Sequence, residues 1–258
     1  MNTRHNLHAV LFDVDGTLAD TERDGHRPAF NAAFKEFGLN WHWDVELYGH
    51  LLIITGGKER IRYFIDKYYP EIPAAIDIKQ LIIDLHQAKT RHYVALLKKG
   101  EIPLRPGIAR LIQQLREENI KIAIATTTTP ENVTILLKST LGDDAPNWFD
   151  IIGAGDIVPQ KKPAPDIYYW VLDQLGLPPY QCIAVEDSEN GLKAALAANV
   201  PALITVNDYT SQQNFQGASL VLSDLGEPTQ HFTVHAGLEP NKGWVDVEML
   251  KNLMDDET

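Results

Sequence analysis

The chain has a single cysteine and no long apolar run. Cys182 has no second cysteine to pair with, so a disulfide framework is excluded and a reducing compartment is allowed. The apolar stretch Leu7–Phe12 is short and runs into an aspartate, which suits neither a membrane span nor a signal peptide. We therefore expect a cytoplasmic protein with no membrane partner.

Basic residues are scarce. The chain has 23 Lys and Arg against 35 Asp and Glu, a net charge of −12, which argues against a nucleic-acid partner because that partner needs a basic face. The nine histidines show no metal-ligand spacing. With 258 residues, 44% of them hydrophobic, the chain can form one domain with an insertion, and we expect a monomer.

Two carboxylates follow the short apolar strand predicted at residues 7–12. Asp13 and Asp15 flank Val14, Gly16 permits a sharp turn, and Thr17 has a hydroxyl that can cap the following segment. Two like charges this close repel each other unless a cation lies between them or one carboxyl keeps its proton. A plain polar turn remains an alternative, whereas a calcium loop needs a longer acidic pattern that is absent here.

The same order of strand, polar tip and helix occurs three more times. The polar tips are Thr126–Thr129 after residues 121–125, Lys161–Asp166 after residues 149–154, and Glu186–Ser188 after residues 181–185. Strands that alternate with helices predict an α/β fold with a parallel sheet and right-handed crossovers. Ligands of such sheets bind beyond the carboxyl ends of the strands, so the four tips are expected to meet in one crevice.

Taken together, these motifs resemble those of the haloacid dehalogenase (HAD) superfamily. The matching residues, in order, are Asp13-x-Asp15-Gly16-Thr17, Thr126, Lys162-Pro163-x-Pro165 and Glu186-Asp187. The resemblance implies a Rossmann-like parallel-sheet core. It also implies phosphate-ester hydrolysis, in which a carboxylate attacks phosphorus and water cleaves the resulting aspartyl-phosphate.

The resemblance assigns roles to the core residues. Asp13 is implied as the nucleophile and Asp15 as the general acid and base, its proton affinity raised by neighbouring carboxylates. Thr126 and the amide of Thr127 are implied to bind phosphoryl oxygens, while Lys162 neutralises charge and holds Asp13.

The implied cofactor is Mg²⁺, a hard cation that takes oxygen ligands and keeps several waters. The resemblance gives its ligands as a carboxylate oxygen of Asp13, the backbone carbonyl of Asp15 and the carboxylate of Asp187, with Glu186 close by.

A long helical segment follows the first motif. Phe30, Ala33, Phe34 and Phe37 fall at helical spacing, and further helices are expected around residues 61–68 and 77–99. We expect residues 20–100 to form a helical cap inserted into a core made of residues 1–19 and 101–258, with residues 101–107 as the return linker. The tail from residue 227 has no predicted function beyond packing against the core.

Within this cap, the turn Thr55-Gly56-Gly57 opens a helix that carries Lys58 and Arg60, an arrangement suited to an anion. Ordinary surface cations at a helix start are the alternative.

Together with Glu22, Tyr48 and the sequence around Lys162, this turn is similar to the CbbY-type sugar phosphatases. That similarity implies a small phosphorylated sugar as the substrate, specifically xylulose 1,5-bisphosphate, and a link to carbon fixation. Its substrate-binding residues would be Glu22, His26, Tyr48, Gly56, Gly57, Lys58, Arg60 and Thr127.

Other functions within the fold remain open. A β-phosphoglucomutase-like enzyme would share every catalytic residue and pass the phosphoryl group to a sugar instead of water. A catalytically idle regulatory protein is disfavoured, because it needs no cluster of mutually repelling charges. Asp15 argues against a dehalogenase, whose halide leaving group needs no proton. A phosphonatase would need a Schiff-base lysine in the cap, which no sequence feature singles out.

Overall fold

The structure is a computed structural model that describes residues 6–54, 56–72 and 77–255. It divides into two compact units. Residues 1–20 and 103–258 form the unit called here the sheet unit, and residues 21–102 form the helical unit. The two connections between them run at Asp20–Thr21 and Ile102–Pro103.

The sheet unit is built on a seven-stranded sheet in the order β3-β2-β1-β4-β5-β6-β7. Its strands are β1 (Ala9–Phe12), β2 (Lys121–Ala125), β3 (Ile151–Gly153), β4 (Cys182–Glu186), β5 (Ala202–Thr205), β6 (Leu220–Leu222) and β7 (Val234–Ala236). Strands β1 to β6 pair in parallel, and β7 is antiparallel to β6. The predicted parallel α/β sheet is confirmed, whereas the antiparallel edge strand was not anticipated.

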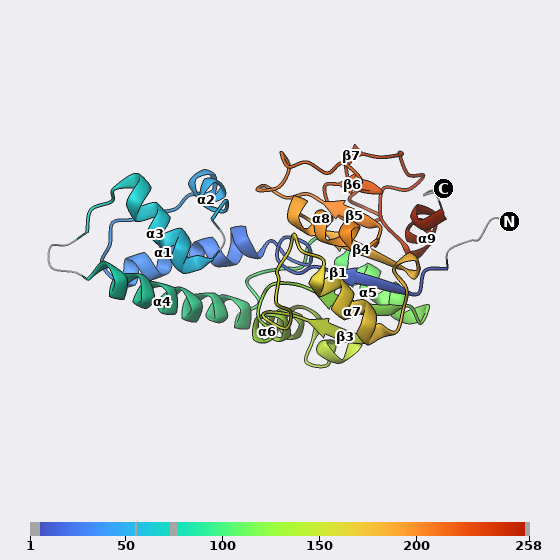
Figure 1. Ribbon diagram of the computed structural model, residues 1–258, viewed down its shortest axis with the longest axis horizontal. Coiled ribbons are helices and arrows are strands. Elements are labelled where there is room, and N and C mark those ends of the chain that lie inside the picture. The colour runs from blue at the N-terminus through green and yellow to red at the C-terminus, as the bar shows by residue number, and fades with distance from the viewer. Residues whose placement is uncertain (1–5, 55, 73–76, 256–258) are drawn as a thin grey trace. The chain divides into compact units, whose positions relative to one another are not determined.

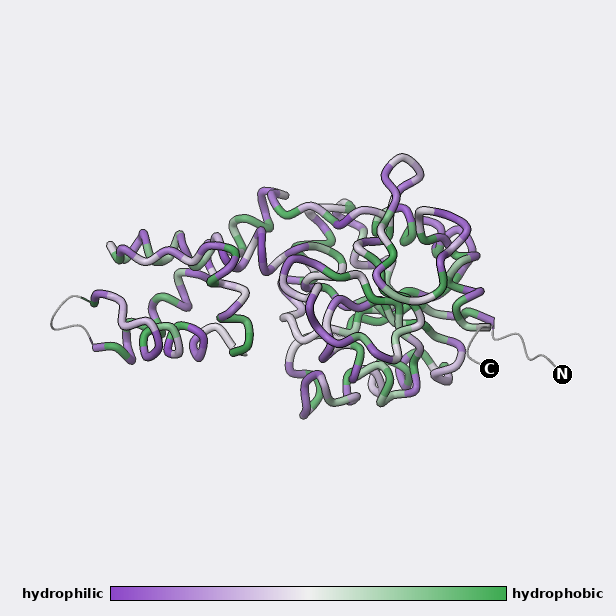
Figure 2. The backbone as a smooth tube through the Cα atoms, turned by 90° about the horizontal axis from the view of Figure 1, so that it is seen from above, coloured by the Kyte–Doolittle hydropathy of each residue, from purple (hydrophilic) through white to green (hydrophobic). Residues whose placement is uncertain are grey.

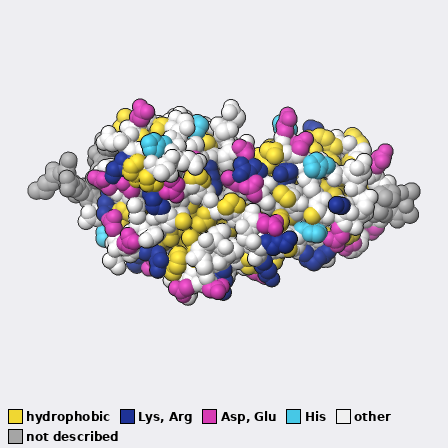
Figure 3. Space-filling view, turned by 180° about the vertical axis from the view of Figure 1, so that it is seen from behind, with side chains coloured by type: hydrophobic (Ala, Val, Ile, Leu, Met, Phe, Trp, Pro, Cys, Tyr) yellow, Lys and Arg dark blue, Asp and Glu magenta, His cyan; other side chains and the backbone are white. Residues whose placement is uncertain are grey.

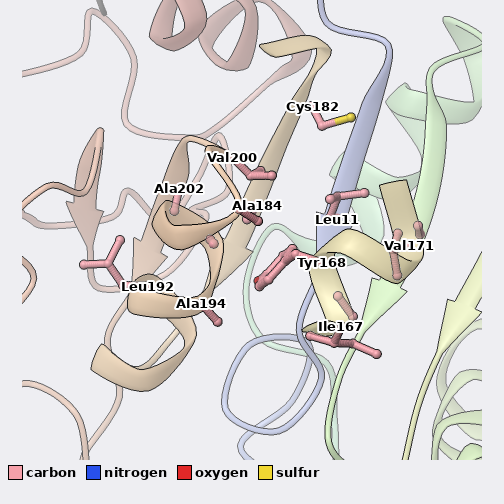
Figure 4. Packing of buried hydrophobic residues seen from close by; sticks show 14 of the residues in the cluster. Leu11, Ile167, Tyr168, Val171, Cys182, Ala184, Leu192, Ala194, Val200 and Ala202 are labelled. Atoms are coloured by element: carbon pink, nitrogen blue, oxygen red, sulfur yellow. The ribbon is translucent and has the colours of Figure 1, made fainter. Parts of the chain in front are cut away.

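The central strands are apolar on both faces because helices cover both faces. Figure 2 shows hydrophobic residues gathered in the interior of this unit, where the buried strands lie. On one face, α7 (Asp166–Leu175) and α8 (Glu189–Ala197) pack over small strand residues. Figure 4 shows Tyr168 and Val171 of α7 close to Leu11 of β1, with Ala184 of β4 nearby. Helix α5 (Ile108–Glu117) contacts β2 and the C-terminal helix α9 (Val247–Asp255).

Local signals set the helix ends. Thr129 caps α6 (Pro130–Leu141), its hydroxyl accepting from the Asn132 N–H, as the Thr-Pro sequence predicts. Ser188 caps α8 in the same way, and Gly176 ends α7 in the left-handed conformation. Two short 3₁₀ turns, η2 (Ala145–Trp148) and η3 (Pro179–Gln181), precede β3 and β4.

The described residues of the helical unit form one π-helical segment and four α-helices, and the latter are labelled in Figure 1. They are η1 (Thr21–His26), α1 (Arg27–Glu36), α2 (Val45–Leu51), α3 (Gly57–Tyr68) and α4 (Ile78–Lys98). Its core is aromatic: the Trp43 ring lies 4.7 Å from Phe30, 4.9 Å from Phe34 and 5.3 Å from Phe64 between centroids. Of the stripe predicted over residues 30–37, Phe30, Ala33 and Phe34 are buried, whereas Phe37 is 38% exposed. In the helix predicted over residues 61–68, Ile61, Phe64 and Ile65 are buried, whereas Tyr68 is 42% exposed.

The C-terminal tail packs on the sheet unit, as expected. Arg110 of α5 donates to the carbonyls of Gly226 and Val245, and Lys251 of α9 pairs with Glu118 at 2.7 Å. Acidic and basic side chains are interspersed on the face drawn in Figure 3. Among the described residues, no helix combines the length and apolarity needed to cross a bilayer.

Candidate active site

Asp13 lies where β1 ends, in the middle of the sheet. Its backbone N–H donates to the carbonyl of Val185 on β4 at 3.0 Å, and the residue is 7% exposed. Because β1 lies between β2 and β4, the carboxyl ends of three neighbouring parallel strands converge around this carboxylate.

Lys162 joins these strand ends. It comes from the loop between β3 and α7, and its Nζ lies 2.7 Å from Asp13 Oδ1, 2.5 Å from Glu186 Oε1 and 2.8 Å from the Ala125 carbonyl. One ammonium thus binds groups at the ends of β1, β2 and β4. The neighbouring Lys161 pairs instead with exposed Asp156, so the structure brings Lys162 and not Lys161 to Asp13.

Three carboxylates cluster here, and the Lys162 ammonium lies beside two of them. Oxygens of Asp13, Glu186 and Asp187 lie within 4.8 Å of one another, and all three residues are buried. Burial raises the pKa of Asp187 well above its ordinary value, and the charges of Asp13 and Glu186 raise it further. Burial also raises the pKa of Glu186, although Lys162 opposes that shift. Burial alone would lower the pKa of Lys162, but the two carboxylates raise it overall, so the amine stays charged.

This donor set fits a hard divalent cation. It consists of carboxylate oxygens, one of which, Glu186 Oε2, is buried and has no hydrogen-bond partner among the described residues. Lys162 neutralises one of three clustered carboxylates, so a bound cation would relieve the remaining repulsion.

Asp15 and Gly16 form the turn after Asp13. Asp15 bridges to Ala19, and Gly16, at φ +88°, donates from its N–H to the Ala19 carbonyl. A side chain at Gly16 would collide with Asp187 and Asn207, so the turn needs glycine for space as well as conformation. The expected cap from Thr17 is wrong: its hydroxyl is buried and accepts or donates no hydrogen bond, because the turn closes through backbone bonds to Val14.

Thr126 lies at the end of β2 and is 1% exposed. Its N–H donates to Gly153 of β3, and its hydroxyl accepts from the N–H of Thr128 at 3.3 Å. Thr127 is exposed at the same strand end. All core residues predicted from the motifs therefore lie at neighbouring strand ends or in the loop after β3.

Three further polar residues of the site were missed in the sequence. Tyr168, fully buried on α7, donates to Glu186 Oε1 at 2.5 Å. Asn207, after β5, donates to Asp187 Oδ2 at 2.7 Å. Buried Arg105 donates to the backbone carbonyls of Gly16, Val206 and Ser223. Each contact joins residues far apart in the chain. The one local signal was the position of Tyr168, three residues after Pro165 of the Lys-Pro motif.

In the helical unit, three of the predicted residues form a chain of hydrogen bonds. Arg60 Nη1 donates to the Tyr48 hydroxyl at 2.8 Å, and that hydroxyl donates to Glu22 Oε2 at 2.5 Å. Arg60 is 7% exposed, and its Nε has no partner in the part of the chain that the structure describes, so it is not the ordinary surface cation that composition alone suggested.

Of the other predicted residues of this unit, Gly56, Gly57 and Lys58 lie at the start of α3, and His26 ends η1. Gly57 packs against the His86 imidazole so closely that a side chain would collide with the ring. Lys58 is exposed. His26 stacks on Tyr93 at 3.9 Å, and burial, followed by the charges of Lys89 and Arg60, lowers its pKa well below the ordinary value. Gly56 precedes the helix at φ +96°, and Thr55 lies outside the described residues.

Comparison with known proteins identifies the family. The model of the haloacid dehalogenase-like hydrolases matches residues 7–199. The plasmid protein CbbY of Cupriavidus necator is 46% identical over 245 residues, which cover 95% of this chain and 96% of that protein. A crystal structure of CbbY from Rhodobacter sphaeroides with phosphate is 46% identical, with a TM-score of 0.73 over 84% of this chain and 94% of the other.

A second crystal structure shows a mutant CbbY from Rhodobacter sphaeroides in complex with xylulose-(1,5)bisphosphate. It is 45% identical, with a TM-score of 0.74 over 86% of this chain and 96% of the other. Family model, sequence identity and fold agree with the four motifs, which confirms the resemblance inferred from them. The chain belongs to the haloacid dehalogenase-like hydrolases and, within that family, to the CbbY proteins.

Proposed function

We propose that this protein is a Mg²⁺-dependent phosphatase of small sugar bisphosphates, with xylulose 1,5-bisphosphate as its substrate and an aspartyl-phosphate as its intermediate. The observation that carries the proposal is the Lys162 ammonium, which binds one oxygen of Asp13 at 2.7 Å beside two further buried carboxylates. That contact fixes one oxygen of Asp13 and leaves the other to attack phosphorus.

In the proposed reaction, an oxygen of Asp13 forms a bond to phosphorus as the bond to the sugar oxygen breaks. Asp15 gives its proton to that leaving oxygen and then takes one from the attacking water. Water cleaves the aspartyl-phosphate, which restores Asp13 and releases inorganic phosphate. Thr126 and Thr127 bind the phosphoryl oxygens, and Lys162 offsets their charge.

Asp13, the Asp15 carbonyl and Asp187 would hold Mg²⁺, with Glu186 close by. When bound, the ion shields the phosphoryl charge from the attacking carboxylate. Glu186 keeps Lys162 in place through the 2.5 Å contact, so its role is tied to the lysine as much as to the ion.

The distal phosphate is assigned to the helical unit. Lys58 is exposed at the start of α3, where backbone N–H groups also favour an anion, and Arg60 has a buried, unpartnered Nε. Glu22, His26, Tyr48, Gly56 and Gly57 complete the proposed binding residues. Support for the sugar itself comes from the CbbY structure that contains xylulose-(1,5)bisphosphate.

The test is a panel of phosphate esters assayed with Mg²⁺, with release of inorganic phosphate and the identity of the sugar product both measured. We expect phosphate release from xylulose 1,5-bisphosphate to exceed that from hexose monophosphates. Isomer formation from β-glucose 1-phosphate without phosphate release would instead identify a phosphomutase, and no turnover of any ester would contradict the proposal.

A further inference from the structure

Asp187 is held on two sides. Its Oδ2 accepts from Asn207 Nδ2 at 2.7 Å, and Gly16 lies so close that a Cβ there would collide with both side chains. The carboxylate is therefore wedged between the turn after β1 and the segment after β5.

The Asn207 amide is itself fixed in direction. Its Oδ1 accepts from the N–H of Tyr209 at 2.9 Å, which leaves Nδ2 as the nitrogen that faces Asp187. Its backbone N–H donates to the Thr210 hydroxyl at 3.0 Å, and its carbonyl accepts from the N–H groups of Thr210 and Ser211. The donor to Asp187 thus comes from a closed turn and not from a mobile side chain.

One guanidinium binds the backbone on both sides of Asp187. Arg105, 8% exposed, donates through Nη1 to the carbonyls of Gly16 and Thr205, and through Nη2 to that of Val206 at 2.5 Å. Gly16 packs on Asp187, and Val206 directly precedes Asn207. Arg105 therefore fixes the spacing of the two segments between which Asp187 lies.

We propose that Asn207 is a positioning residue that orients the Asp187 carboxylate for a divalent cation, from a turn whose place is set by Arg105. The inference rests on the proposed function, because it assumes that Asp187 binds the cation. Without the Nδ2 donor, the carboxylate loses its fixed orientation, and repulsion from Asp13 and Glu186 turns it away. Groups that orient a metal ligand in this way typically change metal affinity 10–100-fold, roughly, when they are removed.

The test is Asn207→Ser, since serine can still accept a turn hydrogen bond but is too short to reach Asp187. The matched control is Asn214→Ser: Asn214 is exposed and also accepts from a backbone N–H two residues on, that of Gln216 at 3.0 Å. Mg²⁺ affinity is measured by calorimetric titration of the full-length protein, and thermal unfolding without Mg²⁺ is recorded for each variant.

We expect Asn207→Ser to weaken Mg²⁺ binding by about 10–100-fold, with a melting temperature like that of Asn214→Ser. Equal Mg²⁺ affinity in Asn207→Ser and wild type would overturn the inference and leave the proposed function standing. A lower melting temperature with unchanged Mg²⁺ affinity would show that Asn207 only supports folding. Wild-type protein that binds no Mg²⁺ would overturn the proposed function, and this inference with it.

Discussion

The two neighbouring tyrosines of α7 differ in the burial of their hydroxyl groups. The Tyr168 hydroxyl is buried and donates to Glu186, whereas Tyr169 is exposed and donates to the carbonyl of Ala197. We expect Tyr168→Phe to lower the free energy of unfolding by about 1.5–3 kcal/mol, as for a hydrogen bond to a charged group. Tyr169→Phe, the control, should change it by about 0.5 kcal/mol or less. Urea unfolding measures both, and equal effects would contradict the assigned burial of the Glu186 contact.

His26 should make the folded protein sensitive to acid. Its pKa is lowered in the folded state by burial, so below about pH 6.5 the unfolded chain binds a proton that the folded chain does not. Stability is therefore full above about pH 6.5 and falls as pH decreases, by at most about 1.4 kcal/mol per pH unit for one group. His86 adds in the same direction, because burial and nearby lysines also lower its pKa.

The measurement is the unfolding free energy of wild type and His26→Gln between pH 7.5 and pH 5.5. His26→Gln should show a shallower loss on acidification. The same pH dependence in both proteins would mean that the His26 imidazole takes up its proton in the folded state as readily as in the unfolded chain.

At the level of elements, the turn after β1 depends on glycine for two reasons that can be separated. Gly16 and Gly142 both have positive φ, at +88° and +106°, but only Gly16 has neighbours where a Cβ would lie. Gly142→Ala should cost about 1–3 kcal/mol from backbone conformation alone. Gly16→Ala should cost about 1–3 kcal/mol more from overpacking against Asp187, and it should also weaken Mg²⁺ binding. Equal costs would show that the turn relaxes away from Asp187.

The local signals predicted the elements that position the site. Residues 121–125 form the expected strand, Thr129 caps its helix, and the helix predicted over residues 77–99 spans Ile78–Lys98. The η1 segment and the strands β5, β6 and β7 were not predicted, because a π-helical turn and strands of three or four residues have little periodicity to detect.

The site was predictable where a motif marks a side chain at a strand end, as for Asp13, or in the loop after a strand, as for Lys162. It was not predictable where a contact spans distant segments and no motif marks either partner. Arg105 binds carbonyls about 90 to 120 residues away in sequence, and Asn207 reaches Asp187 from the next strand. Such contacts depend on the sheet order, which brings β5 beside β4, and local sequence does not encode that order.

For the whole molecule, we propose that the chemistry takes place in the sheet unit and that the helical unit determines selectivity. Lys58→Ala should reduce kcat/KM for the bisphosphate about tenfold to hundredfold, the effect of losing about 1.5–3 kcal/mol of charge-assisted binding. p-Nitrophenyl phosphate has no second phosphate, so its hydrolysis should change little. Arg62→Ala is the control on the same helix, because Arg62 pairs only with exposed Asp66 in the described contacts.

Arg60→Ala should lower activity on the bisphosphate and also destabilise the fold, since it removes the donor to buried Tyr48. A parallel loss on both substrates in Lys58→Ala would show that Lys58 supports the catalytic machinery in general. No loss on either substrate would show that Lys58 is an ordinary exposed lysine that does not bind the substrate.

The central claim is that Asp13 attacks phosphorus, and Asp13→Asn tests it most directly. The amide is nearly isosteric but cannot form an acyl-phosphate, so the variant should remain folded while phosphate release from xylulose 1,5-bisphosphate in Mg²⁺ falls by several orders of magnitude. Circular dichroism and thermal unfolding, recorded beside the phosphate assay, show whether the fold is retained. A folded Asp13→Asn protein with near-normal turnover would contradict the account.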